Sequence, residues 1–511
     1  MRHLCRCITT TGTALAALII LSPVALSAQE TAASGGWIQS QIDYLNEILG
    51  ETVGLIFAFL FYDFGTGFPL IIAVLVTGGV YYTFFFGWLS IRGFTHAIDI
   101  IRGRYDNPDD PGEISHFQAL TSALSATVGL GNIGGVAIAV GTGGPGAVFW
   151  MVLTALFGMS AKLASCTLAV MYRNVREDGH VSGGPMYYLE HGLARKGLRP
   201  LGRTLAVVYA LLVIGGSFGG GNMFQANQTI EVLSTVSPQV KSLSWLIGLV
   251  LAVSVAVVII GGIRRIGSVT SRLVPSMCIL YVVTALAIIF SNATEIPALL
   301  TRIVSEAFTG PAIYGGFLGV LIMGVRRAAF SNEAGLGSAA FAHAAAKTDE
   351  PAREGIVAMI GPFIDTIVIC LMTALVCMIT GVFEDPELKD KGVAMTAAAF
   401  ESFIPGARYV LSIAVVLFAY STMISWSYYG ERAWEYLFGD GSTLLYRAIF
   451  VCFVFIGSVT ALKNVLDFSD AMILGMAFPN ILGGVLLSPQ IKEVLNDYWS
   501  RYKAGSFKVY K

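Results

Sequence analysis

The sequence predicts an all-α membrane protein that crosses the bilayer about eleven times. Two features of its composition support this fold class. Of the 511 residues, 55% are hydrophobic and only 13% are charged, whereas soluble domains carry about 25% charged residues. The mean hydropathy is +0.71. A third observation is that apolar runs close to the ~20 residues needed to span a bilayer recur along the whole chain.

The composition also argues against several classes of function. A net charge of −1 leaves no basic surface for nucleic acid. Most of the seven cysteines lie in apolar spans without CxxC or Cys/His spacing, so no cofactor and no metal other than a transported ion is expected. A membrane enzyme or respiratory-complex subunit would need His, Cys or acidic clusters within spans, and the six histidines are scattered. No obligate protein partner is inferred.

The N-terminal region carries a targeting pattern. Residues 1–28 begin with Arg2 and Arg6, continue through an apolar run and end in small residues, which is typical of a secretory signal peptide. An uncleaved anchor is the alternative. Residues 29–67 follow as an extracytoplasmic segment, in which apolar residues of 37–60 recur at helical steps and indicate an amphipathic helix.

The predicted spans set the topology. They are residues 68–90, 115–141, 145–171, 204–230, 244–262, 273–290, 312–345, 355–380, 407–429, 444–461 and 466–488. With the N-terminus outside, Lys and Arg are roughly threefold more numerous in the loops that fall inside. This indicates a multi-pass protein of a bacterial-type inner membrane with a cytoplasmic tail at 489–511.

The span 115–141 contains the glycine cluster Gly129-Leu130-Gly131-Asn132-Ile133-Gly134-Gly135. Each glycine costs about 1 kcal/mol relative to alanine in a helix, so the cluster predicts a helix that breaks at membrane depth. Such a break is tolerated only where it is buried or lines a watery cavity. Broken helices form the midplane sites of secondary transporters. Close helix packing through small residues is the alternative.

Apart from the extra helix at 68–90, the spans divide into five (115–290) and five (312–488). The second group also opens with a glycine-rich segment, 312–345, which is too long for one straight helix. Interrupted segments at corresponding places favour an inverted-repeat transporter. They also disfavour a channel, because they suggest an occluded site.

The position of the second break is open to two interpretations. Arg326 and Arg327 would be costly at the bilayer centre, which favours a break near Gly319–Gly324 and makes Gly319 a candidate substrate residue. Residues 331–339 would then line the inner vestibule, with Glu333 pairing with an arginine as an inner gate. Arg326, Arg327 and Glu333 are therefore the gate candidates, and the competing position for the break is Asn332–Gly337.

Several segments carry a family resemblance. TVGLGN at 127–132 resembles the broken first helix of LeuT-type folds. The segments at 143–158, 182–190, 219–228 and 324–351 are similar to the alanine-or-glycine:cation symporter family, and the resemblance covers about residues 60–490. It implies a LeuT-type core of five plus five helices and sodium-coupled uptake of alanine or glycine by alternating access. Proton coupling, with the deeply placed Asp365 as carrier, is the alternative.

The resemblance also implies a sodium site. Carbonyls near Ser125 and Val128 would face span 407–429, which offers the Ala419 carbonyl and the Thr422 hydroxyl, with Ser421 as the alternate hydroxyl. The alternative for both hydroxyls is a hydrogen bond back to their own helix.

A transporter of this kind lies in the lipid bilayer. Its substrate would be a zwitterion. Its carboxylate would bind backbone N–H groups at Gly129, Gly131 and Asn132, which form the broken turn. Thr127 and Asn132 are candidates for the substrate or a second ion.

The third core span offers the rest of the predicted substrate pocket. Asn222 and Gln225 beside Phe224 suit an amino group and a small side chain, and Trp426 would cap the pocket and favour alanine and glycine. Packing in the core or the interfacial belt is the alternative for both aromatic residues.

Overall fold

The computed structural model describes residues 51, 54, 57–177, 181–260, 262–309 and 315–510. Residues 53–511 form one compact unit. The signal peptide and most of the amphipathic segment predicted at 29–67 lie outside the described residues. Within the described residues the unit is helical except for a short antiparallel pair, β1 (Asn174–Val175) and β2 (Val181–Ser182).

The first half of the unit contains one extra helix and then the first broken span. Its elements are α3 (Leu70–Phe85), α4 (Leu89–Arg92), α5 (Phe94–Ile101), α6 (His116–Thr127), η1 (Gly131–Gly135), α7 (Val136–Gly143), α8 (Gly146–Met171), α9 (Pro185–Tyr187), η2 (Tyr188–Gly192), α10 (Leu193–Arg195), α11 (Arg199–Phe218), η3 (Gly219–Met223), α12 (Phe224–Val236), η4 (Pro238–Val240), α13 (Ser244–Ile259), α14 (Gly262–Ser291) and α15 (Ile296–Thr309).

The second half opens with the other broken span. Its elements are α16 (Gly316–Asn332), α17 (Ala340–Ala344), α18 (Pro351–Ala358), α19 (Ile360–Pro362), η6 (Phe363–Cys370), α20 (Leu371–Ile379), η7 (Val382–Glu384), α21 (Val393–Phe403), α22 (Ala407–Phe438), η8 (Asp440–Ser442), α23 (Thr443–Val459), α24 (Leu462–Gly475) and α25 (Ala477–Lys503). Of the labels beginning with η, η1, η2, η3 and η6 are π-helical.

Among the described residues, seven helices are long and apolar enough to cross a membrane, and one bent pair adds an eighth. The apolar helices α3 and α13 are shorter, as is α21, for which no span was expected. Each predicted span overlaps a helix or a broken helix of the structure. The all-α membrane fold is therefore confirmed, while the count of eleven spans stays a prediction.

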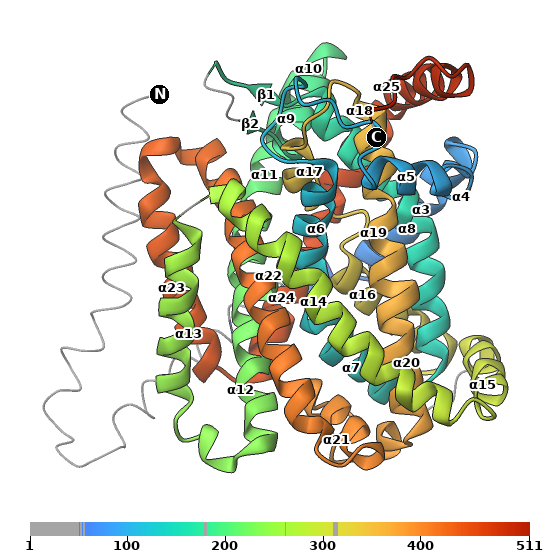
Figure 1. The fold of residues 1–511 in the computed structure, drawn as a ribbon, viewed down its shortest axis with the longest axis vertical. Coiled ribbons are helices and arrows are strands. Elements are labelled where there is room, and N and C mark those ends of the chain that lie inside the picture. Colours follow the sequence, from blue (N-terminus) through green and yellow to red (C-terminus); the bar gives the residue numbers. More distant parts are fainter. Residues whose placement is uncertain are drawn as a thin grey trace, which may run out of the picture. The chain divides into compact units, whose positions relative to one another are not determined.

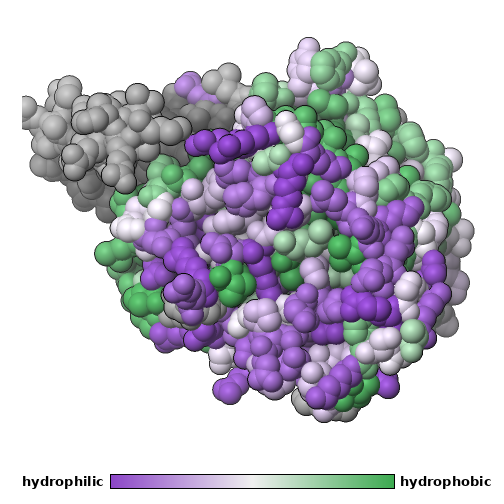
Figure 2. Space-filling model, turned by 90° about the horizontal axis from the view of Figure 1, so that it is seen from above, coloured by the Kyte–Doolittle hydropathy of each residue, from purple (hydrophilic) through white to green (hydrophobic). Residues whose placement is uncertain are grey.

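The two ends of the helical bundle differ in the loops that they carry. In Figure 1, α4, α5, α9 and α10 lie at the upper end, and α15 and α21 lie at the lower end. The upper end thus gathers the loops that were predicted to face inside because of their Lys and Arg. Figure 2 shows this end from above, with hydrophilic residues over much of the face and smaller hydrophobic patches among them and at the margin.

The first break lies where the glycine cluster predicts it. Helix α6 starts with a capping box, in which Ser115 Oγ accepts from the Gln118 amide (3.2 Å) and Gln118 Oε1 accepts from the Ser115 amide (3.0 Å). It ends at Thr127, and the pair α6 with η1–α7 is bent by 52°. The residues from 119 through the glycine cluster are buried, so the freed backbone has no access to lipid.

The second break is not where the first interpretation placed it. Helix α16 runs without interruption from Gly316 to Asn332, so a break near Gly319–Gly324 is wrong and Gly319 lies inside a helix. The chain leaves the helix at Glu333–Ala339, close to the competing position. Glu333 has a left-handed backbone (φ 55°), and Gly335 and Gly337 follow with φ of 85° and 83°.

The reason for the error is the partner of the two arginines. Arg326 Nε donates to Asp470 Oδ2 of α24 at 2.7 Å, and Arg327 also contacts this carboxylate. The side chains of Arg327 and Asp470 are 1% and 0% exposed. Because Asp470, together with Asp467 beside Arg326, compensates their charge, α16 can carry both arginines inside the bundle without breaking before them.

Replacing Asp470 tests this account. In Asp470→Asn the Arg327 guanidinium stays buried without its counter-charge, which costs about 3–5 kcal/mol. We expect a clear drop in the melting temperature of the detergent-purified protein. Asp467→Asn is the matched control, because Asp467 is 31% exposed and its carboxylate lies 3.5 Å from Arg326. Equal melting temperatures for the two variants would contradict the role of Asp470.

Candidate functional site

The two breaks meet in the middle of the bundle. A Cβ atom added at Gly131 would lie 3.3 Å from the Cα atom of Ser331, so the backbones of η1 and α16 are in direct contact there. Two π-helical segments, η1 and η6, carry polar side chains into this region. π-Helical turns are frequent at functional sites because they displace side chains from the regular helical positions.

The oxygen-rich cluster lies where the end of α6 faces α22. Thr422 Oγ1 donates to the Ser125 carbonyl (3.0 Å), Ser125 Oγ donates to the Ser421 carbonyl (2.8 Å), and Ser425 Oγ donates to Ser125 Oγ (2.9 Å). All these residues are buried, as are Val128 and Ala419. Ser125 and Thr422 are therefore brought together as predicted.

Ser421 behaves differently from its neighbour. Its hydroxyl donates to the Phe418 carbonyl of the same helix at 2.9 Å, which is the alternative expected for a hydroxyl inside a helix. Ser425 supplies the second hydroxyl instead. The sequence contained a signal for it, because Ser425 lies three residues after Thr422 and thus on the same face of α22.

Side-chain amides satisfy the N–H groups of the first break. Asn132 Oδ1 accepts from the Gly129 amide (2.8 Å), and Gln225 Oε1 of α12 accepts from the Leu130 amide (3.3 Å). Gln225 Nε2 donates to the Gly220 carbonyl at 2.8 Å, which holds its orientation. Both side chains therefore lie at the first break.

A buried carboxylate joins the two breaks. Asn132 Nδ2 donates to Asp365 Oδ1 (2.7 Å), and the Ser331 and Thr366 hydroxyls both donate to Asp365 Oδ2 (2.8 Å each). Asp365 is 0% exposed. Its carboxylate therefore bridges η1, the end of α16 and η6.

The second break is held by charged side chains. Lys162 Nζ of α8 donates to the Asn332 carbonyl at 3.0 Å, at the end of α16. Glu333 accepts from Trp426 Nε1 (3.0 Å) and from the Ser338 hydroxyl. Among the described residues no arginine pairs with Glu333, so the predicted Glu333–Arg inner gate is wrong. The arginines pair with Asp470 instead.

The remaining predicted substrate residues take different roles. Trp426 packs on η3, because a Cβ atom added at Gly221 would lie 2.3 Å from the Trp426 ring. Phe224 contacts Phe330 edge-to-face, with ring centres 5.3 Å apart. Asn222 Nδ2 donates to the Phe450 carbonyl of α23 (2.7 Å), away from the breaks. Thr127 Oγ1 bonds back to the Ala123 carbonyl at 3.2 Å.

A family model described as the sodium:alanine symporter family matches residues 56–511. The chain belongs to this family. It is 43% identical over 425 residues to the sodium/alanine symporter AgcS of Methanococcus maripaludis, an alignment that covers 82% of this chain and 92% of AgcS.

Two relatives from Bacillus subtilis are similar over most of their length. The amino-acid carrier protein AlsT is 32% identical (92% of this chain, 95% of AlsT), and the probable sodium/glutamine symporter GlnT is 33% identical (86% and 90%). The symporter family is one of membrane transporters and not of enzymes, and the resemblance found in the sequence is confirmed.

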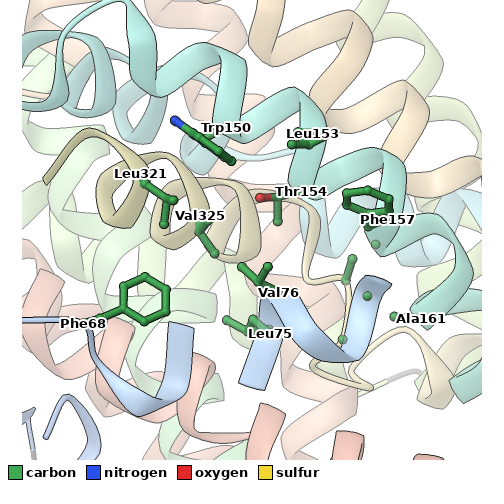
Figure 3. A pocket seen from close by; sticks show the side chains of 14 residues that line it. Phe68, Leu75, Val76, Trp150, Leu153, Thr154, Phe157, Ala161, Leu321 and Val325 are labelled. Carbon is green, nitrogen blue, oxygen red and sulfur yellow. The ribbon is translucent and has the colours of Figure 1, made fainter. Parts of the chain in front are cut away.

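An apolar pocket of this symporter lies beside the second break. Figure 3 shows it between α3, α8 and α16, with Leu75, Phe157 and Val325 pointing toward it. It reaches the broken segment at Ala334 and Gly335. Its lining side chains are apolar except for Thr154 and the indole N–H of Trp150, so this pocket does not suit a zwitterion. The residues at the breaks themselves are buried.

Besides that of Ser425, sequence reasoning missed the contacts of three residues near the breaks. Ser331 and Thr366 are hydroxyl residues within predicted spans, but their contact with Asp365 depends on which helices are neighbours. Lys162 is recognisable in the sequence only as an intramembrane charge. Nothing in its local sequence indicates a backbone carbonyl of α16 as its partner.

A substitution at the first break tests the geometry of the oxygen-rich cluster. A Cβ atom at Gly129 would lie 2.5 Å from Thr422 Oγ1, whereas one at Gly135 meets nothing within 4 Å. If sodium stabilises the protein through this cluster, the melting temperature rises when sodium chloride replaces potassium chloride. We expect Gly129→Ala to lose this rise and Gly135→Ala to keep it. Loss in both variants would contradict the predicted contact.

Proposed function

We propose that this protein uses a sodium gradient to take up a small neutral amino acid, alanine or glycine, by alternating access. The observation that carries the proposal is the oxygen-rich cluster formed by Ser125, Thr422 and Ser425 at the first break. Oxygen ligands are those that hard cations prefer. The relatives named for sodium and alanine support the choice of ion and substrate.

The cluster fits sodium by its donor set. Ser125 offers a carbonyl and a hydroxyl, Thr422 and Ser425 offer hydroxyls, and Ser421 offers its carbonyl; all are buried and come from only two helices. A bound sodium ion would supply the positive charge that holds α6 and α22 together. When α22 separates from α6, the set of oxygen ligands is lost. Binding of sodium to the cluster and the relative position of α6 and α22 therefore depend on each other.

The first break fits an amino-acid carboxylate. Its Gly129 and Leu130 amides are already satisfied by the neutral amide oxygens of Asn132 and Gln225. A carboxylate is a stronger acceptor than an amide oxygen, so it would replace them without leaving the backbone unsatisfied. The Trp426 ring on η3 and the Phe224–Phe330 pair limit the space for a side chain, which favours alanine and glycine over larger substrates.

The buried charges support coupling to a cation. Lys162, Glu333 and Asp365 are all buried near the breaks. With all three ionised, one negative charge remains without a counter-charge, which is costly inside a protein. A sodium ion or a proton would compensate it, so Asp365 keeps proton coupling as the second candidate.

The proposed orientation follows the Lys and Arg distribution. The end of the bundle seen in Figure 2 would face the cytoplasm, with the C-terminal tail inside and the N-terminus outside, in a bacterial-type inner membrane. The division of the core into two repeats, 115–290 and 312–488, remains part of this proposal.

The first experiment compares gradients in proteoliposomes. With an inward sodium gradient at constant pH we expect uptake of labelled alanine, and with an equal potassium gradient none. Asp365→Asn keeps the shape of the side chain, and we expect its remaining uptake to stay sodium-dependent. Uptake driven by a pH gradient in the wild type and lost in this variant would instead assign the coupling to a proton on Asp365.

Two neighbouring hydroxyls provide a matched test of the ion site. Thr422→Val removes the hydroxyl that faces Ser125, and we expect the sodium concentration for half-maximal uptake to rise about 10-fold or more. Ser421→Ala removes a hydroxyl that bonds back to its own helix, and we expect little change. The site would be misplaced if Ser421→Ala had the larger effect.

A further inference from the structure

A basic pocket lies between the α3–α4 region and α25. Figure 1 shows α4 and the end of α25 at the upper end of the bundle. Its apolar side is formed by Phe86, Leu89 and Leu495. Its polar side is formed by Arg92, Lys492, Asn496 and Trp499. We refer to these residues as the basic pocket. It is distant in sequence and in the fold from both helix breaks.

The two cations of the basic pocket, Arg92 and Lys492, have N–H donors available for a ligand. Arg92 Nη1 donates to the Gly87 carbonyl at 3.3 Å, and Lys492 Nζ lies 4.4 Å from the centre of the Phe85 ring. Both residues are exposed, and over the described ranges neither forms an ion pair. None of the described residues that line the pocket is a carboxylate. By contrast, Arg501 on the same helix binds Glu350 and Asp497.

Trp499 adds a donor that lacks an acceptor. Its Nε1–H is buried and has no hydrogen-bond partner among the described residues. A buried donor without a partner is unfavourable, so a ligand with several acceptor oxygens at this position would satisfy it. Together with Arg92 and Lys492, the indole N–H indicates a site for an anion that accepts several hydrogen bonds.

The walls of the basic pocket are held in place by the protein. Tyr81 OH and Ser488 Oγ of α3 and α25 lie 2.8 Å apart, and His96 Nε2 of α5 lies 2.9 Å from Tyr498 OH. Burial lowers the pKa of His96 to about 4. The His96 ring is therefore neutral near pH 7, and the positive charge at the pocket comes from Arg92 and Lys492.

The position of the pocket matches the boundary of the bilayer. The neighbouring residues Phe84, Trp88 and Ile91 are 61%, 38% and 60% exposed, so α3 and α4 present apolar and aromatic side chains to their surroundings. Aromatic residues concentrate at the membrane interface. The hydrophilic end face in Figure 2 begins at the same end of the bundle. The pocket therefore lies at the level of lipid headgroups.

We propose that the basic pocket binds the phosphate of an anionic phospholipid from the bilayer leaflet at this end. Arg92, Lys492 and the Trp499 indole would donate to the phosphate oxygens, and the apolar side would contact the upper part of the acyl chains. Basic pockets between transmembrane helices bind anionic headgroups in this way. The apolar side and the exposed aromatic residues favour a lipid over a free phosphate ion. The proposal does not depend on the transported substrate.

The test measures lipid retained by the full-length protein. Detergent-purified protein is incubated with mixed micelles of phosphatidylglycerol and phosphatidylcholine and washed, and the bound lipid is quantified by mass spectrometry. We expect phosphatidylglycerol to be retained preferentially and to raise the melting temperature, while glycerol phosphate in solution has no effect. If glycerol phosphate raised the melting temperature equally, the pocket would be a site for a soluble anion, and the proposal would be overturned.

Matched variants separate the pocket from general surface charge. Arg92→Gln/Lys492→Gln is expected to reduce retained phosphatidylglycerol about 10-fold or more, since each basic residue near an anionic surface contributes a factor of about five. Lys503→Gln/Lys508→Gln removes the same charge from the same end without touching the pocket and is expected to retain the lipid. Equal loss in both double variants would overturn the proposal.

Trp499→Phe keeps an aromatic ring, removes the N–H and leaves the charge unchanged. If the first double variant fails to fold, Trp499→Phe tests the pocket instead. Unchanged retention of phosphatidylglycerol in Trp499→Phe would then overturn the proposal. Uptake assays play no part in this test, so its failure is separate from that of the proposed transport function.

Discussion

The structure depends on one constraint: backbone groups freed by a helix break at membrane depth need partners inside the protein. At the first break the Asn132 and Gln225 amide oxygens accept from the Gly129 and Leu130 amides. At the second break the Lys162 ammonium binds the last carbonyl of α16. These partners come from other turns and other helices, so each break stabilises, and is stabilised by, the packing of the whole bundle.

The same constraint explains where charge is placed. Arg326 and Arg327 both contact the Asp470 carboxylate, and Arg326 also lies 3.5 Å from Asp467, so two arginines face two carboxylates beside α24. The set of Lys162, Glu333 and Asp365 lacks one positive charge when ionised. A protein in a medium of low polarity tolerates such an imbalance only where another charge enters. The imbalance therefore lies at the breaks, next to the oxygen-rich cluster, and not in the α16–α24 pair.

Local sequence predicted the first break, because glycine weakens a helix wherever it stands, and it predicted the Ser125–Thr422 contact through the family resemblance. It did not predict the second break from the arginines. Their cost depends on Asp470, which is more than 140 residues away in the chain. Ser425 could have been predicted from its helical spacing to Thr422. The contacts of Ser331, Thr366 and Lys162 could not be predicted, because they depend on which helices pack together.

The two breaks differ in the strength of their partners. Neutral amide bonds contribute about 1 kcal/mol each, whereas bonds to charged groups contribute about 1.5–3 kcal/mol. Under the proposed function, a substrate carboxylate would therefore replace the Asn132 and Gln225 oxygens at the first break. The Lys162 and Glu333 contacts at the second break resist exchange. Asp365 connects Asn132 of the first break to Ser331 of the second. A ligand that displaces Asn132 thus changes the partners of Asp365, and through it the end of α16.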